Sequence, residues 1–227
     1  MTRKLRFDIV SDIVCPWCII GYKQVEKAIA ALNTAADEAD KIQAEFYWHP
    51  FELNPNMPAG GENAAEHIAR KYGRTVEQGR QARQALVDKG AALGFTFNYG
   101  DDMHVYNSFG GHKLIHWAGA SFGPAAQTRM KLALFNAYFT EGKNIDDMDV
   151  LLATAMKAGF ESEGARAALL DEEITRAVRA EQHMWRERDI QGVPAIIIAE
   201  KYMVPGAQDA DVFQNIIKNI LAKEAAA

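Results

Sequence analysis

Two cysteines, three positions apart, are the residues of this sequence best suited to chemistry. They form the run Cys15-Pro16-Trp17-Cys18, and the 227-residue chain has no other cysteine. A disulfide that closes so small a loop restrains the unfolded chain very little, so stabilisation of the fold is a poor reason for the pair. Two thiols at this spacing can instead exchange with a substrate disulfide. The pattern therefore predicts a redox-active dithiol.

The predicted elements around the pair place it at the start of a helix. Residues 5–10 alternate in polarity and predict a strand, and an apolar stripe after the cysteines predicts a helix from about Pro16. Helix N-terminal amides and the helix dipole favour an anion, so we expect a lowered pKa for Cys15 and assign it as the nucleophile. Cys18, one turn further, would be the resolving thiol. Pro16 and Trp17 would tune the redox potential.

Metal binding is the first alternative for these residues. Structural zinc takes four ligands, whereas this chain has one cysteine pair and its six histidines lie far from it. His112 and His116 share one face of a predicted helix, but no Glu follows His112 as the metalloprotease pattern requires. We therefore expect no metal site, and we expect these histidines to pack or to form hydrogen bonds. A second alternative, two inert buried cysteines, is disfavoured by their position after a strand.

The rest of the chain predicts a thioredoxin-like α/β fold. A second strand over 44–51 follows the first helix, and two short strands over 194–199 and 202–204 precede a last amphipathic helix. The βαβ and ββα pieces must join into one sheet, since neither covers itself. The intervening region has helical periodicity. We therefore predict a thioredoxin-like domain over 1–58 and 190–227, with an all-helical insertion over 59–189.

Composition limits the partners and the compartment. The formal charge of −5, without a long block of one sign, disfavours nucleic acid. The apolar stretch near the N-terminus is interrupted by Asp8 and Asp12, and no segment approaches the ~20 apolar residues of a membrane span. The expectation is a cytoplasmic protein without a membrane partner, monomeric or homodimeric. A cytosolic glutathione pool would favour a reductase or isomerase role over net oxidation.

Four separated motifs resemble the DsbA-like family of the FrnE type, in the same order along nearly the whole chain. They are Phe7-Asp8-Ile9-Val10-Ser11-Asp12 leading into the cysteines; Trp48-His49-Pro50-Phe51-Glu52-Leu53-Asn54-Pro55; Asn107-Ser108-Phe109 with His112-Lys113-Leu114-Ile115-His116-Trp117-Ala118; and Gly192-Val193-Pro194 followed by Gly206-Ala207-Gln208. The resemblance implies a thioredoxin fold with a helical insertion and thiol–disulfide oxidoreductase or disulfide isomerase activity on protein or small-molecule substrates.

The same resemblance implies roles for individual residues. It implies a cis bond at Val193-Pro194 facing the cysteines, with the backbone of Val193 pairing with the bound substrate. Asn54 and Asn107 belong to the motif segments and would line the substrate groove, although turn formation and helix capping account for them equally well. No bound cofactor is implied beyond the Cys15–Cys18 disulfide itself. Some family members carry a further cysteine pair near the C-terminus, which this chain lacks.

Two other functions remain open at this stage. Kappa-class glutathione transferases and 2-hydroxychromene-2-carboxylate isomerases share the architecture but carry serine at the position of Cys15. A glutathione-dependent isomerase or transferase is thus the alternative, with glutathione as co-substrate or electron donor and an anion held near Gly206 to Gln208. A partner-binding module with an incidental disulfide is the third reading. His49 and Glu52 are candidates for proton transfer to Cys18, or exposed surface residues.

Overall fold

The structure is a computed structural model that describes residues 3–225 except 39, 74 and 101. The chain opens with β1 (Arg3–Ser11), α1 (Pro16–Thr34) and β2 (Ile42–Pro50), and it closes with β5 (Ala195–Ile198), β6 (Tyr202–Pro205) and α9 (Ala210–Ala225). Between them lie β3 (Glu62–Asn63), α2 (Ala64–Tyr72), α3 (Val76–Ala92), β4 (His104–Val105), α4 (Phe109–Phe122), α5 (Pro124–Phe135), the π-helical turn η1 (Asn136–Thr140), α6 (Met148–Lys157), α7 (Ser162–Leu170) and α8 (Glu172–Glu187).

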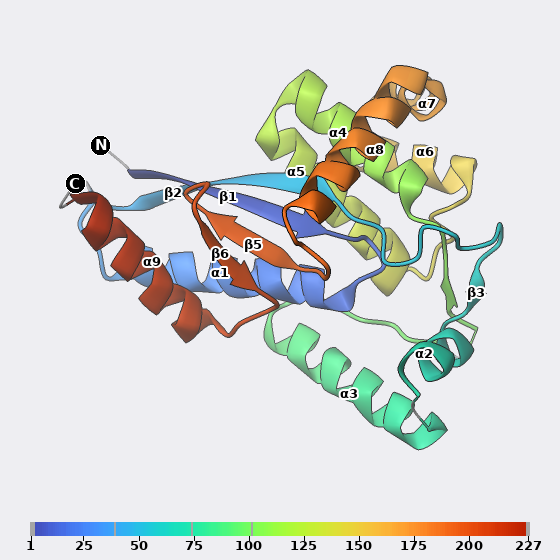
Figure 1. Ribbon diagram of the computed structural model, residues 1–227, viewed down its shortest axis with the longest axis horizontal. Helices are drawn as coiled ribbons and strands as arrows, with labels where there is room; N and C mark the ends of the chain where they lie inside the picture. The colour runs from blue at the N-terminus through green and yellow to red at the C-terminus, as the bar shows by residue number, and fades with distance from the viewer. Residues whose placement is uncertain (1–2, 39, 74, 101, 226–227) are drawn as a thin grey trace.

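The first and last pieces of the chain form one four-stranded sheet in the order β2-β1-β5-β6 (Figure 1). Strands β1 and β2 are parallel, with Ile9 opposite Trp48, while β5 runs antiparallel to β1, with Ile196 opposite Ile9. Strand β6 continues the sheet as an antiparallel hairpin with β5. The predicted α/β class and the order βαβ then ββα are therefore confirmed.

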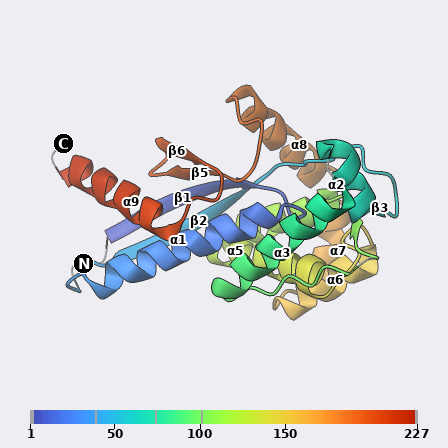
Figure 2. The ribbon, with the colours of Figure 1, turned by 90° about the horizontal axis from the view of Figure 1, so that it is seen from below.

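Alternation along β1 sends successive side chains to the two faces of the sheet. Phe7 and Ile9 enter the main core, to which α1, α5 and α9 contribute. Val10 points to the other face and packs in a smaller cluster with Trp185 of α8. Figures 1 and 2 show α1 and α9 on one side of the sheet and α8 on the other. Asp8, also on the α8 side, is a charged group in a buried strand.

The inserted region is mainly helical but contains two short strands. β3 and β4 pair antiparallel through Glu62 opposite Val105 and Asn63 opposite His104, and residues 93–100 and 102–103 between α3 and β4 are not helical. The expectation of an all-helical insertion is wrong at these points, because two-residue strands carry no periodicity that a sequence can show. The division at 58/59 and 189/190 stays a prediction, and its ends at 1–2 and 226–227 lie outside the described residues.

Helix starts follow local chemistry that the sequence displays. Pro16 and Pro124 occupy first-turn positions, where the missing N–H is not needed. Thr75 and Gln78 form a capping box at the start of α3. Among the described residues, no helix combines the length and apolar character that a membrane-spanning helix needs.

Candidate active site

Cys15 lies at the junction between β1 and α1. It is the N-cap residue of α1, with Pro16 as the first helical residue, and Cys18 lies one turn into the helix. Both cysteines are unbonded thiols and are buried, Cys15 with 4% of its surface exposed and Cys18 with none. Trp17, between them, is 45% exposed. The helix start thus holds two thiols next to each other and shields both.

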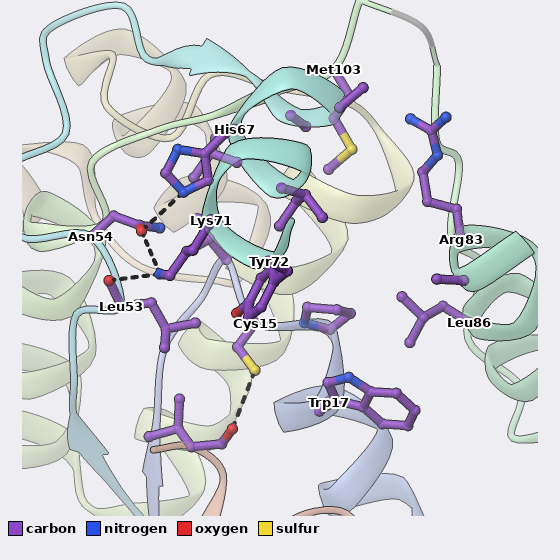
Figure 3. A pocket seen from close by; sticks show the side chains of 18 of the residues that line it. Cys15, Trp17, Leu53, Asn54, His67, Lys71, Tyr72, Arg83, Leu86 and Met103 are labelled. Carbon is purple, nitrogen blue, oxygen red and sulfur yellow. Dashed lines mark hydrogen bonds between the residues drawn. The ribbon is translucent and has the colours of Figure 1, made fainter. Parts of the chain in front are cut away.

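The segment that returns from the insertion to the sheet lies directly against Cys15. The Val193–Pro194 peptide bond is cis, as the resemblance implies. The Val193 carbonyl accepts a hydrogen bond from the Cys15 thiol at 3.6 Å, a distance that sulfur allows (Figure 3). The Pro194 carbonyl accepts from the N–H of Gly206 at 2.8 Å, which joins this segment to the end of β6.

The two thiols do not ionise as the sequence led us to expect. The hydrogen bond with Cys18, burial and the Asp12 carboxylate raise the pKa of Cys15 well above its ordinary value, and the Cys18 N–H at the helix start opposes them only in part. Burial also raises the pKa of Cys18, but the hydrogen bond with Cys15 and the charge of Lys131 outweigh it, so the pKa of Cys18 is lowered. The expected low pKa of Cys15 is therefore wrong for this reduced arrangement.

A buried group of charges beneath the dithiol explains this result. Asp12 is fully buried; its carboxylate accepts the Leu53 N–H at 2.7 Å, and Oδ1 lies 3.4 Å from His112 Nε2. Burial alone would raise the pKa of Asp12. His112 and the Leu53 N–H lower it by more, so its pKa lies below the ordinary value and the carboxylate stays charged. Burial lowers the pKa of Lys131 to about 8, against the opposing effect of Cys18 and Asp12.

Lys131 reaches this place from the inserted helix α5. Its Nζ lies 4.8 Å from the centroid of the Phe135 ring and 5.4 Å from that of Trp48. Sequence analysis missed this lysine, although its apolar neighbours on both sides were a usable signal. A lysine enclosed in such a run, on the helical face of Phe135, is expected to face the core. The positive charge of Lys131 lowers the pKa of Cys18.

A cavity of about 880 Å³ opens beside Cys15, between the end of the sheet and the α2–α3 segment (Figure 3). Cys15, Pro16, Trp17 and Val193 all line it, so the structure brings these predicted residues together. Nothing in the sequence indicates that α2 and α3 line the other side of this cavity.

The two predicted asparagines lie in different surroundings. Asn54 lines the cavity, and its Oδ1 accepts from Lys71 Nζ at 2.8 Å and lies 3.1 Å from His67 Nε2. Asn107 is not among the lining residues; its side chain accepts the Phe109 N–H at 2.8 Å at the start of α4. Substrate contact by either residue stays a prediction.

The histidines and Glu52 make specific contacts of their own. His49 lies between two carboxylates, with Nε2 2.8 Å from Asp8 and Nδ1 2.5 Å from Glu181, rather than beside Cys18. Glu52 is 2% exposed, so the expectation of a surface residue is wrong; its Oε2 accepts from Arg179 and Gln182. Among the described residues, no group of three or more His, Cys, Asp or Glu side chains could hold a metal.

Comparison with known proteins is consistent with this geometry. The model of the DSBA-like thioredoxin domain family matches residues 6–218. A probable DsbA oxidoreductase from Streptomyces coelicolor is 28% identical, with a TM-score of 0.84 over 96% of this chain and 90% of that one.

Two more distant structures share the fold. A 2-hydroxychromene-2-carboxylate isomerase (16% identity, TM-score 0.68) covers 97% of this chain and 98% of its own. The cytosolic disulfide reductase DsbM from Pseudomonas aeruginosa, solved with GSH (15% identity, TM-score 0.60), covers 96% and 99%. An isomerase and a disulfide reductase are therefore both among the proteins that share this fold.

Proposed function

The chain belongs to the DSBA-like thioredoxin domain family, and from that premise we propose that it is a thiol–disulfide oxidoreductase whose redox centre is Cys15 and Cys18. The observation that carries the proposal is the pair itself: two thiols at the start of α1, hydrogen-bonded to each other, of which Cys15 faces a cavity. Cys15 borders the cavity, whereas Cys18 is fully buried. Cys15 is therefore the sulfur that meets substrate.

The exchange has two steps. The Cys15 thiolate attacks one sulfur of the substrate disulfide; a bond forms between Cys15 and that sulfur, and the other substrate sulfur leaves as a thiolate that takes up a proton. The Cys18 thiolate then attacks Cys15, forming the Cys15–Cys18 disulfide and releasing the second substrate thiol. Two electrons pass from the protein to the substrate, and an external thiol restores the dithiol.

The proton positions in the structure suggest how the first step begins. The raised pKa of Cys15 and the lowered pKa of Cys18 favour a reduced pair in which Cys15 keeps its proton, shared between the Cys18 sulfur and the Val193 carbonyl. Transfer of that proton to Cys18 would leave the charge on Cys15, next to substrate, without moving it through solvent. The Val193 backbone, already at Cys15, is proposed to pair with the substrate chain.

Turnover with a disulfide substrate tests this proposal. Reduction of insulin by dithiothreitol should be accelerated by the wild-type protein and not by Cys15→Ser, while Cys18→Ser should accumulate a mixed disulfide on Cys15. Since the chain has only two cysteines, any trapped adduct is assigned without ambiguity. Equal rates for wild type and Cys15→Ser would refute the proposal.

The glutathione-dependent isomerase or transferase remains a second candidate, favoured by the fold shared with the isomerase structure. Conjugation or isomerisation that needs glutathione and persists in Cys18→Ser would favour it, because that chemistry does not use the resolving thiol. For the compartment, we propose the cytoplasm, with support from the fold shared with the cytosolic reductase.

A further inference from the structure

The cavity beside Cys15 has the size and lining of a small-molecule site. Its volume of about 880 Å³ lies within the roughly 300–1,000 Å³ typical of such sites. Trp17 of α1, Leu86 of α3 and Met103 before β4 are among the apolar side chains that dominate its lining. A ligand with an apolar body would gain free energy by burying its surface here.

The cavity carries positive charge on a protein whose formal charge is −5. Lys71 of α2, Arg83 of α3 and Arg186 of α8 line it from three separate helices. Of the two lining carboxylates, that of Glu52 is already engaged by Arg179, and Glu66 is exposed near the start of α2. The positive charge of these side chains that the lining carboxylates do not neutralise favours an anionic ligand.

Arg83 is the cation best placed to receive such an anion. The other two basic residues of α3 are Arg80, which pairs with Glu77, and Lys89, which pairs with Asp209. Within the described part of the chain, no carboxylate forms an ion pair with Arg83, although its side chain is half-buried. Figure 3 shows Arg83 and Leu86 projecting from α3 into the side of the cavity opposite Cys15.

Tyr99 supplies a second, independent polar group in the same cavity, and both Cys15 and Arg83 affect it electrostatically. Its ring lines the cavity, and its hydroxyl is buried without a hydrogen-bond partner in the described residues. Burial and the electrostatic effect of Cys15 raise the pKa of Tyr99, while Arg83 opposes them, so the hydroxyl stays a donor. A buried donor with no acceptor is costly, and an incoming anion would satisfy it.

Access to the nucleophile narrows the class of substrate. Only 4% of Cys15 is exposed and its sulfur borders the cavity, so a small or flexible disulfide reaches it more easily than one held rigidly in a folded domain. A substrate has to enter the cavity between α1 and the α2–α3 segment, with its disulfide against Cys15. This favours a compact molecule over a disulfide fixed in a folded domain.

We infer that the site selects low-molecular-weight disulfides that combine an apolar body with a carboxylate, and that Arg83, assisted by the Tyr99 hydroxyl, binds the carboxylate. The inference rests on the proposed disulfide exchange and names its substrate class. In the reaction, the bonds formed and broken are those of the exchange described above; Arg83 and Tyr99 take no part in electron transfer and act as specificity-determining residues.

Two model disulfides of opposite character test it. The reduced protein is mixed with 5,5′-dithiobis(2-nitrobenzoate), which is aromatic and anionic, or with 4,4′-dithiodipyridine, which is aromatic and uncharged, and the second-order rate of thiol release is measured. Arg83→Gln should slow the reaction with the anionic reagent roughly tenfold, as for loss of one charge-assisted hydrogen bond, and leave the neutral reagent unaffected. Arg80→Gln, on the same helix but outside the cavity, is the matched control and should behave as wild type.

Tyr99→Phe keeps the ring in place and gives a second reading if Arg83→Gln folds poorly. It should slow the anionic reagent by about threefold, as for a neutral hydrogen bond, again without effect on the neutral one. An unchanged ratio of the two rates in both variants overturns the inference alone. Failure of the wild type to react with either reagent faster than a free thiol overturns the proposed function and the inference with it.

Discussion

The two reduced cysteines lose their protons as a pair, not independently. The hydrogen bond between the sulfurs lets the first proton leave at a lowered pKa and makes the second hard to remove, so the pKa values belong to the pair rather than to one residue. The Asp12 carboxylate disfavours a thiolate on Cys15, whereas the Lys131 ammonium favours a thiolate on Cys18. The helix N-terminus, which the sequence does reveal, is one influence among several.

Lys131→Met tests the contribution of the buried lysine. Since the ammonium of Lys131 lowers the pKa of Cys18, its removal should raise the pH at which the dithiol loses its first proton. Titration of thiolate ultraviolet absorbance measures this. Lys113→Met removes another buried lysine, one bound to the Leu169 carbonyl and Thr175, and should leave the thiol titration unchanged. The same midpoint in wild type and Lys131→Met would show that Lys131 does not act on Cys18.

Helix α8 is linked to the sheet by ion pairs between one histidine and two carboxylates. Asp8 of β1 and Glu181 of α8 clamp His49 of β2 from its two ring nitrogens, and His49 also packs on Trp185 at 4.7 Å between ring centroids. Burial raises the pKa of Glu181, but His116 and His49 outweigh it and lower it to about 2. Burial lowers the pKa of His49, yet the two carboxylates raise it overall.

These shifts predict the pH range in which the network stabilises the fold. The contribution of His49 is complete below its ordinary pKa of 6.5 and is lost as the pH rises through its raised value. The contribution of Glu181 is complete above its ordinary pKa of 4.5 and is lost as the pH falls toward 2. Both are therefore fully present between pH 4.5 and 6.5.

His49→Gln should lower the free energy of unfolding by about 3 kcal/mol in that range, since it leaves two buried carboxylates without their shared partner. Urea denaturation at several pH values measures the loss, which should shrink at high and at low pH. His183→Gln breaks an exposed pair with Glu187 on the same helix and should cost no more than about 0.5 kcal/mol. A His49→Gln loss that is independent of pH would indicate lost packing against Trp185 instead.

The longer strands of the sheet could be predicted because their residues carry a recognisable pattern of polarity. The alternation of Leu5, Phe7 and Ile9 and the apolar run over 195–198 correspond to β1 and β5. The strands β3 and β4 could not, since each is two residues long and is set by pairing with the other. The same limit applies to η1, where the hydrogen-bonding pattern changes within a continuous helical sequence.

At the scale of the whole molecule, the insertion completes the active site. The cysteines come from the βα junction, but the lysine beneath them comes from α5, and the wall opposite Cys15 comes from α2 and α3. Figure 1 places both chain ends at one end of the molecule and α2 at the other. The family resemblance implied the cis bond at Val193–Pro194, which the structure has, while Cys15 as the nucleophile stays a prediction.

The sequence could not predict that Lys131 would lower the pKa of Cys18 or that Arg83, distant from Lys131 along the chain, would line the cavity beside Cys15. Their positions depend on how the inserted helices pack on the sheet, which local periodicity does not determine. Asp12 illustrates the same point at short range: it stands three residues from Cys15, yet its orientation is fixed by Leu53 and His112 from other segments. The motif therefore shows where the site is, but tertiary contacts determine the charges and pKa values of its groups.

Equilibration of the protein with buffers of graded redox potential, followed by alkylation and mass spectrometry, measures directly whether Cys15 and Cys18 form one redox couple. We expect both thiols to become protected together in a single transition with a two-electron slope of about 30 mV per tenfold change. The chain has no other cysteine, so no other pair can produce this result. Two thiols that remain alkylated at every potential, or that are protected independently, would contradict a role in disulfide exchange.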